Sequence, residues 1–292
     1  MAVVQKAAAN YPKHRQCFSC HHQTMPILAM VAARNNQRVI DSQLLQDQAK
    51  FTHKSFHGEL NGLKAGKGIG GKAMTVGYGL WALRLADWKP DEITEAMVTY
   101  LIKTQHAEGY WTGQVSRPPF EESYFTATVL AIQGMQHYAT SDQKKSTESA
   151  IAKAKSWLIN TPAKDQEDKA FRLWGLLLLG ERGKEMTAAR QAVLSAQKED
   201  GGWGQTDDMK SDAYATGQAL FVLREAGMDP ANKSYQLGSQ FLLRTQDRDG
   251  SWFVKTRSRP IQTYFDNGDP HGVDQFISTP ATAWAVAALV VK

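Results

Sequence analysis

The sequence predicts an all-α fold, a closed (α/α)6 toroid of six inner and six outer helices. Three observations predict it: one short element occurs three times, amphipathic stretches precede its copies, and more apolar stretches follow them. Apolar residues recur at helical spacing throughout, so we expect helices and no strands.

The repeated element reads Gln-x-x-x-Gly-x-Trp. Its copies are Gln105–Trp111, Gln197–Trp203 and Gln246–Trp252, so the glutamines are 92 and 49 residues apart. If the first interval spans two units, the unit is roughly 45–50 residues long, which is typical of helical toroids and solenoids. We expect a degenerate copy near Asn160. In each copy the glycine suits a chain reversal after a helix, and the tryptophan can pack between neighbouring helices, so we interpret the element as structural.

The elements follow from this pattern in chain order. Stretches apolar nearly all round belong in the interior, and they predict inner helices at residues 25–35, 71–86, 121–134, 168–180, 211–227 and 278–291. More polar partners predict outer helices at residues 3–10, 41–53, 91–105, 146–159, 188–197 and 232–246. We expect a single domain over residues 1–292, with the N-terminal ends of the inner helices meeting at one mouth of a central cavity.

The composition excludes several classes of protein. The chain has 292 residues, a formal net charge of +5, 42% hydrophobic and 22% charged residues, which is ordinary for a globular protein. No apolar run is long enough for a transmembrane segment. The basic residues do not cluster, so we expect no nucleic-acid partner. The first residues lack the pattern of a signal peptide, so we expect a cytoplasmic protein or one whose leader has been removed.

The two cysteines carry the clearest chemical signal. The segment Cys17-Phe18-Ser19-Cys20-His21 has the spacing of covalent haem c attachment. Both thiols would add to the haem vinyl groups, and His21 would be the iron ligand. Haem c would imply a periplasmic or otherwise exported protein and a redox partner protein. Two alternatives stay open, a zinc or other metal site that uses the same residues and an unligated or redox-active thiol pair.

Other polar residues are expected near the same mouth. His271 precedes the last inner helix and is a candidate sixth iron ligand or pocket acid–base group. Asp212 and Tyr214 open another inner helix and are candidate catalytic residues. Further polar residues at inner-helix starts are Glu121, Glu122, Tyr124 and Asp274. Carboxylates at these positions also have an ordinary explanation, because they stabilise the positive end of a helix dipole.

The repeats resemble the QW motifs of the squalene–hopene cyclase and terpenoid cyclase/protein prenyltransferase superfamily, over about residues 41–291. The resemblance implies an (α/α)6 toroid around an apolar cavity. The acidic Asp-x-Asp-Asp motif of the cyclases corresponds to Ser211–Thr216, which retains one carboxylate, Asp212. The zinc ligands of the prenyltransferases have no counterpart, because both cysteines here are N-terminal. Residues 19–23 and 264–278 resemble a bacterial branch in which the toroid carries a cytochrome c-like Cys-x-x-Cys-His.

Three functional hypotheses follow. The first is a haem c toroid that binds a small apolar, isoprenoid-like ligand in the central cavity or performs redox chemistry on it. The second is a terpene cyclase or prenyltransferase-type enzyme that uses zinc or Asp212 alone as the acid. The third is a non-enzymatic interaction scaffold whose barrel is filled by its own side chains.

Overall fold

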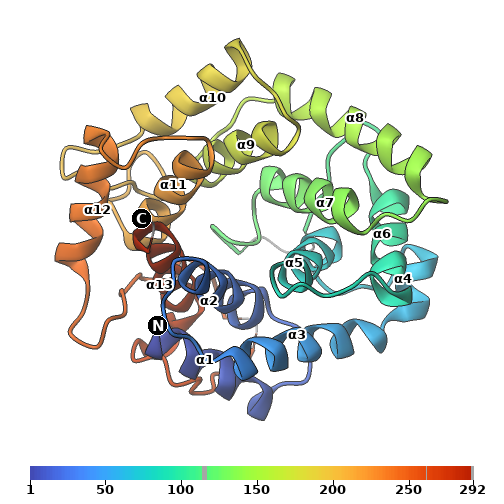
Figure 1. Ribbon diagram of the computed structural model, residues 1–292, viewed down its shortest axis with the longest axis horizontal. Helices are drawn as coiled ribbons and strands as arrows, with labels where there is room; N and C mark the ends of the chain where they lie inside the picture. The colour runs from blue at the N-terminus through green and yellow to red at the C-terminus, as the bar shows by residue number, and fades with distance from the viewer. Residues whose placement is uncertain (114–116, 261, 291–292) are drawn as a thin grey trace.

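A computed structural model describes residues 1–113, 117–260 and 262–290. Two concentric rings of helices form a closed barrel (Figure 1). In these described ranges the only β-structure is one isolated bridge between Trp203 and Asp212. The all-α toroid predicted from the sequence is confirmed.

The inner ring consists of helices that are buried on nearly every side. They are α2 (Met25–Asn35), α5 (Lys72–Leu85), α7 (Tyr124–Tyr138), α9 (Gln166–Leu178), α11 (Ala213–Glu225) and α13 (Gln275–Leu289). Each contacts the next, and α13 packs against α2, so the ring is closed by the two ends of the chain.

The outer ring consists of amphipathic helices, each buried along one face. They are α1 (Ala2–His14), α3 (Ser42–His57), α6 (Glu92–Thr104), α8 (Lys144–Asn160), α10 (Lys184–Ser195) and α12 (Lys233–Thr245). Shorter elements lie between the rings' helices: η1 (Cys20–Thr24), α4 (Leu60–Ala65) and η2 (Gly272–Asp274). The predicted order of inner and outer helices is therefore correct, although α1, α3 and α7 end four residues later than predicted and α10 begins four residues earlier.

Glycines let the inner helices approach one another closely. A Cβ at Gly77 of α5 would lie 2.7 Å from Cβ of Leu130 on α7. A Cβ at Gly217 of α11 would lie 2.7 Å from the backbone nitrogen of Ala285 on α13. Since real Cβ atoms do not approach so closely, these positions require glycine, and this explains why small residues alternate with large ones in the inner stretches.

The repeated element ties each outer helix to its neighbours. In the second copy, Trp203 Nε1 donates to the carbonyl of Val193 in the last turn of α10 at 2.7 Å. Gln197 Nε2 donates to the carbonyls of Gly201 and Ser234, both at 2.8 Å, and Ser234 is on the next outer helix. The tryptophan backbone N–H of each copy donates to a threonine of the following inner helix, Thr128, Thr216 or Thr282.

The tryptophan bonds recur in the other copies, and the glutamine bond to the next outer helix recurs in the first copy, where Gln105 Nε2 donates to the carbonyl of Ala150 at 2.8 Å. Trp111 Nε1 donates to Leu101 and Trp252 Nε1 to Leu242, each at 2.8 Å. The glycines have positive φ in all three copies (103° at Gly109, 86° at Gly201 and Gly250). Because helix C-terminal carbonyls lack intrahelical partners, each copy caps one helix and joins it to the following inner helix, and the first two copies also join it to the next outer helix.

Large side chains fill the centre of the barrel. Trp81 lies 5.0 Å from Trp174 and 6.0 Å from Trp284, measured between ring centroids, and Phe221 lies 5.2 Å from Trp284. The cavities described below lie at the mouth formed by the N-terminal ends of the inner helices. No helix in the described ranges combines the length and the apolar character needed to cross a membrane.

Candidate metal centre at the mouth of the toroid

A cavity of about 340 Å³ opens at this mouth. The chain segment before α2 forms one wall, the approach to α5 forms a second, and the loop before α7 together with α13 forms the rest. Its lining includes Cys17, Cys20, His21, Arg117 and Glu121. The Cys-x-x-Cys-His motif and a carboxylate predicted at an inner-helix start are therefore brought into one space.

The segment that carries the motif is fixed by its neighbours. Residues 20–24 form a single π-helical turn that leads into α2, and such turns occur frequently at functional sites. His22 is fully buried between Ser19, whose Oγ lies 3.0 Å from Nδ1, and Asn267, whose Nδ2 donates to Nε2 at 2.6 Å. Thr24 Oγ1 donates to the carbonyl of Tyr78 at 3.0 Å.

Burial lowers the pKa of His22 to about 3, so its ring is neutral. Both of its ring nitrogens already have partners. His22 therefore acts as an anchor for the motif, and it leaves the ligand position to its neighbour His21.

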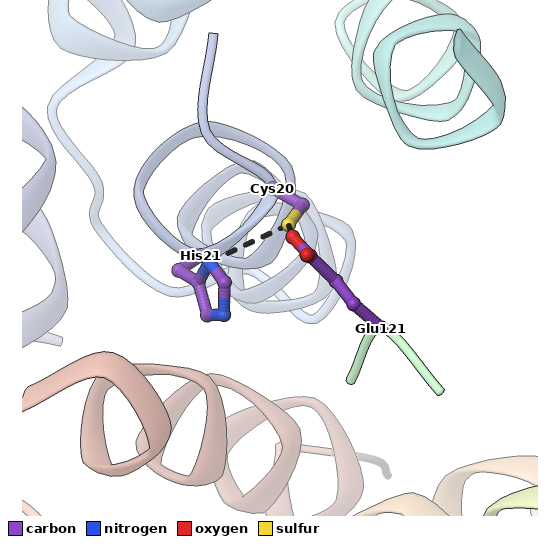
Figure 2. Close-up of side chains that lie close together, drawn as sticks. All are labelled: Cys20, His21 and Glu121. Carbon is purple, nitrogen blue, oxygen red and sulfur yellow. Dashed lines mark hydrogen bonds between the residues drawn. The ribbon is translucent and has the colours of Figure 1, made fainter. Parts of the chain in front are cut away.

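Cys20, His21 and Glu121 form a compact group of potential metal ligands (Figure 2). One ligand atom of each lies within 4.8 Å of the other two. Cys20 Sγ is 3.4 Å from His21 Nδ1 and 3.6 Å from Glu121 Oε1. Cys20 and His21 come from the start of the first inner helix, and Glu121 reaches them from the loop before α7.

Arg117 orients the carboxylate of this group. Its Nε donates to Glu121 Oε2 at 2.7 Å, and its Nη2 contacts the same oxygen. The other oxygen, Oε1, is left facing the thiol of Cys20. Carboxylate ligands in metal sites are commonly fixed by such hydrogen bonds.

The environment makes the thiol and the imidazole neutral in the absence of a cation. Burial and the neighbouring Glu121 carboxylate raise the pKa of Cys20 well above its usual value. Burial and the Arg117 charge lower the pKa of His21 well below its usual value. A neutral imidazole is the form that can bind a metal.

A second, more apolar cleft of about 200 Å³ adjoins the cavity and shares His21 and Arg117 with it. Its apolar wall includes Phe120, Phe276 and Ile277. Phe120 stacks on His21 at 4.4 Å and on Tyr78 at 4.8 Å, so it separates the cleft from the barrel interior.

The structure places the other predicted site residues away from this group. Asp212 is the N-cap of α11: Oδ1 accepts from the Ala215 N–H at 2.9 Å and Oδ2 accepts from Gln205 at 2.8 Å. Burial raises its pKa to about 6. Tyr214 is fully buried, and its hydroxyl donates to Glu167 at 3.0 Å. A catalytic role for either residue stays a prediction.

His271 is engaged elsewhere as well. Its Nε2 lies 2.9 Å from Ser251 Oγ and 3.7 Å from Asp247, and its ring packs against Phe253. It is not part of the Cys20 group or of the two linings described above. A role of His271 as iron ligand or acid–base group therefore also stays a prediction.

Sequence reasoning missed two residues near the mouth, Arg117 and Glu167. Arg117 lies four residues before Glu121, which is the spacing of a helical ion pair, but it falls outside any predicted helix. Glu167 occupies the first turn of α9, where a carboxylate is expected for dipole reasons alone. Its burial inside the barrel has no local signal in the sequence.

Neither a protein-family model nor a curated protein sequence matches the chain. Its structure is similar to that of a protein from Actinoplanes, with a TM-score of 0.62 and 14% identity over 99% of this chain and 98% of that one. It is also similar to the type II terpene cyclase MstE from Scytonema, with a TM-score of 0.61 and 13% identity over 99% and 97% of the two chains.

Two further similar structures show how widely this architecture is used. The ent-copalyl diphosphate synthase from Streptomyces platensis has a TM-score of 0.54 and 16% identity over 91% of this chain and 50% of that one. A possible member of the GH105 family from Salmonella enterica has a TM-score of 0.55 and 12% identity over 99% and 92%. At these identities the likeness defines the class of fold, a terpene cyclase-like α/α toroid, and function has to be argued from the site.

Proposed function

We propose that the mouth of the toroid is a metal-dependent site in which Cys20, His21 and Glu121 hold one divalent transition metal, best matched by zinc. The observation that carries the proposal is the spacing of the ligand atoms. Zinc bonds to sulfur at ~2.3 Å and to nitrogen or oxygen at ~2.0–2.2 Å, so two ligands of a tetrahedral site lie roughly 3.5 Å apart. Cys20 Sγ lies 3.4 Å from the imidazole nitrogen and 3.6 Å from the carboxylate oxygen.

The donor set supports zinc over harder cations. One sulfur, one nitrogen and one oxygen suit zinc, whereas magnesium and calcium prefer oxygen ligands alone. Three protein ligands leave a fourth position for water or substrate, as in catalytic zinc sites. A metal held by these three residues would supply Lewis-acid activation of an oxygen or sulfur atom bound at the fourth position.

The chain's own residues define what could bind beside such a metal. Arg117 keeps Glu121 in place, and the wall of Phe120, Phe276 and Ile277 favours an apolar molecule. MstE variants have been solved with geranylgeranyl dihydroxybenzoate as substrate. A small, isoprenoid-like apolar ligand therefore suits this chain too, and the class of enzyme is a metal-dependent terpenoid cyclase or transferase.

Haem c is a second candidate cofactor, because Cys17, Cys20 and His21 line one cavity. The cavity of about 340 Å³ lies near the lower end of the ~300–1,000 Å³ range of small-molecule sites. A porphyrin with its ~40 heavy atoms needs the upper part of that range. Covalent haem therefore requires the Arg117–Glu121 segment or Phe276 to move aside. With haem, the protein would be an exported redox protein with a partner protein.

Metal titration of the reduced protein tests the proposal. Cobalt is used as a spectroscopic substitute for zinc, because a cobalt–thiolate bond adds a charge-transfer band. We expect one equivalent to bind, and we expect Cys20→Ser and Glu121→Gln to weaken binding at least 10-fold. Cys17→Ser is the matched control and should bind as the wild type does.

Three other results would contradict the zinc site. Equal losses in Cys17→Ser and Cys20→Ser, with Glu121→Gln unaffected, would indicate a thiol pair. A c-type pyridine haemochrome spectrum, retained after denaturation when the protein is exported with haem-maturation machinery, would establish haem c. Absence of both metal and haem would leave the scaffold hypothesis.

A further inference from the structure

A larger cavity, of about 560 Å³, lies beside the glycine-rich loop that joins α4 to α5. The loop, the start of α5 and the C-terminal part of α6 with the segment after it form its walls. These three helices are neighbours in the toroid (Figure 1). Gly70 of the loop also lines the cavity of the candidate metal centre, so the two cavities adjoin at this residue. None of Cys20, His21 and Glu121 lines the larger one.

The lining of this cavity carries positive charge. Lys67, Lys72 and His106 belong to it, and no carboxylate of the described residues does. Neither lysine forms an ion pair with a described residue, whereas the neighbouring Lys64 is paired with Glu92 at 2.6 Å. A concave surface lined by one sign of charge attracts ligands of the opposite sign. The cavity therefore favours an anion.

Tyr100 of α6 offers this cavity a hydroxyl group that the protein does not use. The residue is 3% exposed and lines the cavity, yet its hydroxyl has no hydrogen-bond partner among the described residues. The unpartnered hydroxyl of Tyr78 is enclosed by protein, but that of Tyr100 is not, so it is open to the cavity. Burial raises the pKa of Tyr100, so the hydroxyl keeps its proton and can donate. Buried tyrosine hydroxyls normally have a partner, which indicates that this one is supplied from outside the chain.

The loop itself allows a ligand to approach the backbone closely. Gly70 does not have a positive φ, and a Cβ there would meet no described atom within 4 Å. Neither conformation nor packing in the described chain therefore accounts for a glycine at this position, whereas close approach of a ligand does. The next residue, Gly71, is the N-cap of α5 and has no side chain with which to cap the helix. The N-terminal end of a helix favours a negative charge.

We propose that this cavity binds a phosphate group, held by Lys67, Lys72 and the hydroxyl of Tyr100 at the start of α5. A phosphate monoester has a charge close to −2 and three terminal oxygens, so it matches two lysines and a donating hydroxyl better than a carboxylate does. The volume of about 560 Å³ lies within the ~300–1,000 Å³ range of small-molecule sites, so there is room for the organic part of a monoester. A free phosphate ion shares the same chemistry.

The phosphate site goes beyond the proposed function and does not depend on a metal. The two can therefore fail separately. Cys20→Ser removes a proposed metal ligand and should bind phosphate as the wild type does. Tyr100→Phe should bind cobalt as the wild type does.

Isothermal titration calorimetry of the full chain with glycerol 3-phosphate, glycerate and inorganic phosphate tests the site. We expect one equivalent of glycerol 3-phosphate to bind at least ~10-fold more tightly than glycerate, in which a carboxylate replaces the phosphate group. Tyr100→Phe and Lys72→Gln should each weaken binding of glycerol 3-phosphate ~10-fold or more, as expected for a hydrogen bond to a charged group. Tyr124→Phe and Lys145→Gln are the matched controls, because both residues are exposed and lie outside this lining. They should bind as the wild type does.

The stability of Tyr100→Phe separates loss of binding from loss of folding. Because the hydroxyl has no partner in the described chain, the variant should unfold in urea with the same free energy as the wild type when phosphate is absent. A clearly destabilised variant would show that the hydroxyl is used by the protein, and this would overturn the site.

The probes also distinguish the two sources of phosphate. Tighter binding of glycerol 3-phosphate than of inorganic phosphate would support a site for a monoester, and equal binding would support a site for the free ion. Binding that Tyr100→Phe and Lys72→Gln leave unchanged, or no saturable binding of either phosphate, would overturn the proposal.

Discussion

Replacing Glu167 by glutamine tests the buried acid at the centre of the barrel. The amide keeps the shape of the side chain and one acceptor oxygen, but it cannot ionise. Burial raises the pKa of Glu167 to about 8 from an ordinary value of 4.5. The hydrogen bonds that Gln218, Thr126 and Tyr214 donate to its carboxyl group only partly oppose this effect. We therefore expect Glu167 to be neutral in the folded protein at pH 7.

The sign and size of the effect follow from this shift. Between pH 4.5 and pH 8 the folded protein binds a proton that the unfolded chain releases, so the free energy of unfolding falls as pH rises. Each pH unit within that range removes ~1.4 kcal/mol. From pH 5 to pH 7 the free energy of unfolding of the wild type should fall by about 2.5 kcal/mol more than that of Glu167→Gln. Above pH 8 this group contributes no further change.

Other groups near Glu167 titrate as well, and the comparison accounts for them. Tyr78 of α5 and Tyr214 of α11 face it, and burial raises the pKa of both. Asp165, just before α9, has a pKa raised to about 6 by burial and by the nearby Asp168. These groups are present in both proteins, so the difference between the two curves isolates Glu167.

Urea unfolding, followed by tryptophan fluorescence at several pH values, gives the required free energies. Near pH 5 the two proteins should agree within about 1 kcal/mol, because a protonated acid and an amide are similar in charge and shape. Between pH 5 and pH 8 the free energy of unfolding of the variant should then rise steadily relative to that of the wild type. A constant difference across that range would refute the buried neutral acid.

Three further predictions concern the repeated element and the proposed metal centre. Gly109→Ala should destabilise by at least about 3 kcal/mol in urea unfolding, because its Cβ would lie 2.5 Å from a carbonyl oxygen of α8. Gly180 also has a positive φ, but a Cβ there would meet no other atom, so Gly180→Ala should destabilise the protein by only about 1 kcal/mol. Equal destabilisation by the two variants would contradict the predicted steric clash at Gly109. Gln197→Ala should cost about 1 kcal/mol more than Gln246→Ala in the same assay, since it loses an extra bond to the next outer helix. Arg117→Gln should lower metal affinity ~10-fold or more in competition with a chelator, and unchanged affinity would show that Glu121 needs no support.

The fold could be predicted because its signal is local and repeated. Each Gln-x-x-x-Gly-x-Trp copy bonds within its own unit and the next, as Trp203 does to Val193 and Gln197 does to Ser234. Such contacts recur at a fixed period and leave a pattern in the sequence. The ends of the helices were less predictable, because amphipathic periodicity fades where capping decides the boundary.

The site could be predicted only in part. The spacing of Cys17, Cys20 and His21 is local, so the sequence shows it. Glu121 was one of several polar residues at inner-helix starts, and only the closed ring brings its carboxylate to a thiol 101 positions away. The burial of Glu167 likewise depends on three inner helices at once, and no short segment records it.

The closure of the ring has a consequence for when the proposed metal site can form during synthesis. All three proposed metal ligands lie within the first 121 residues, yet the motif is anchored through His22 to Asn267, 245 positions further along the chain. The first inner helix also packs against the last one. During synthesis the thiol and imidazole leave the ribosome long before the helix that fixes their geometry. The proposed metal would therefore bind late, after the last inner helix has been made and packed against the first.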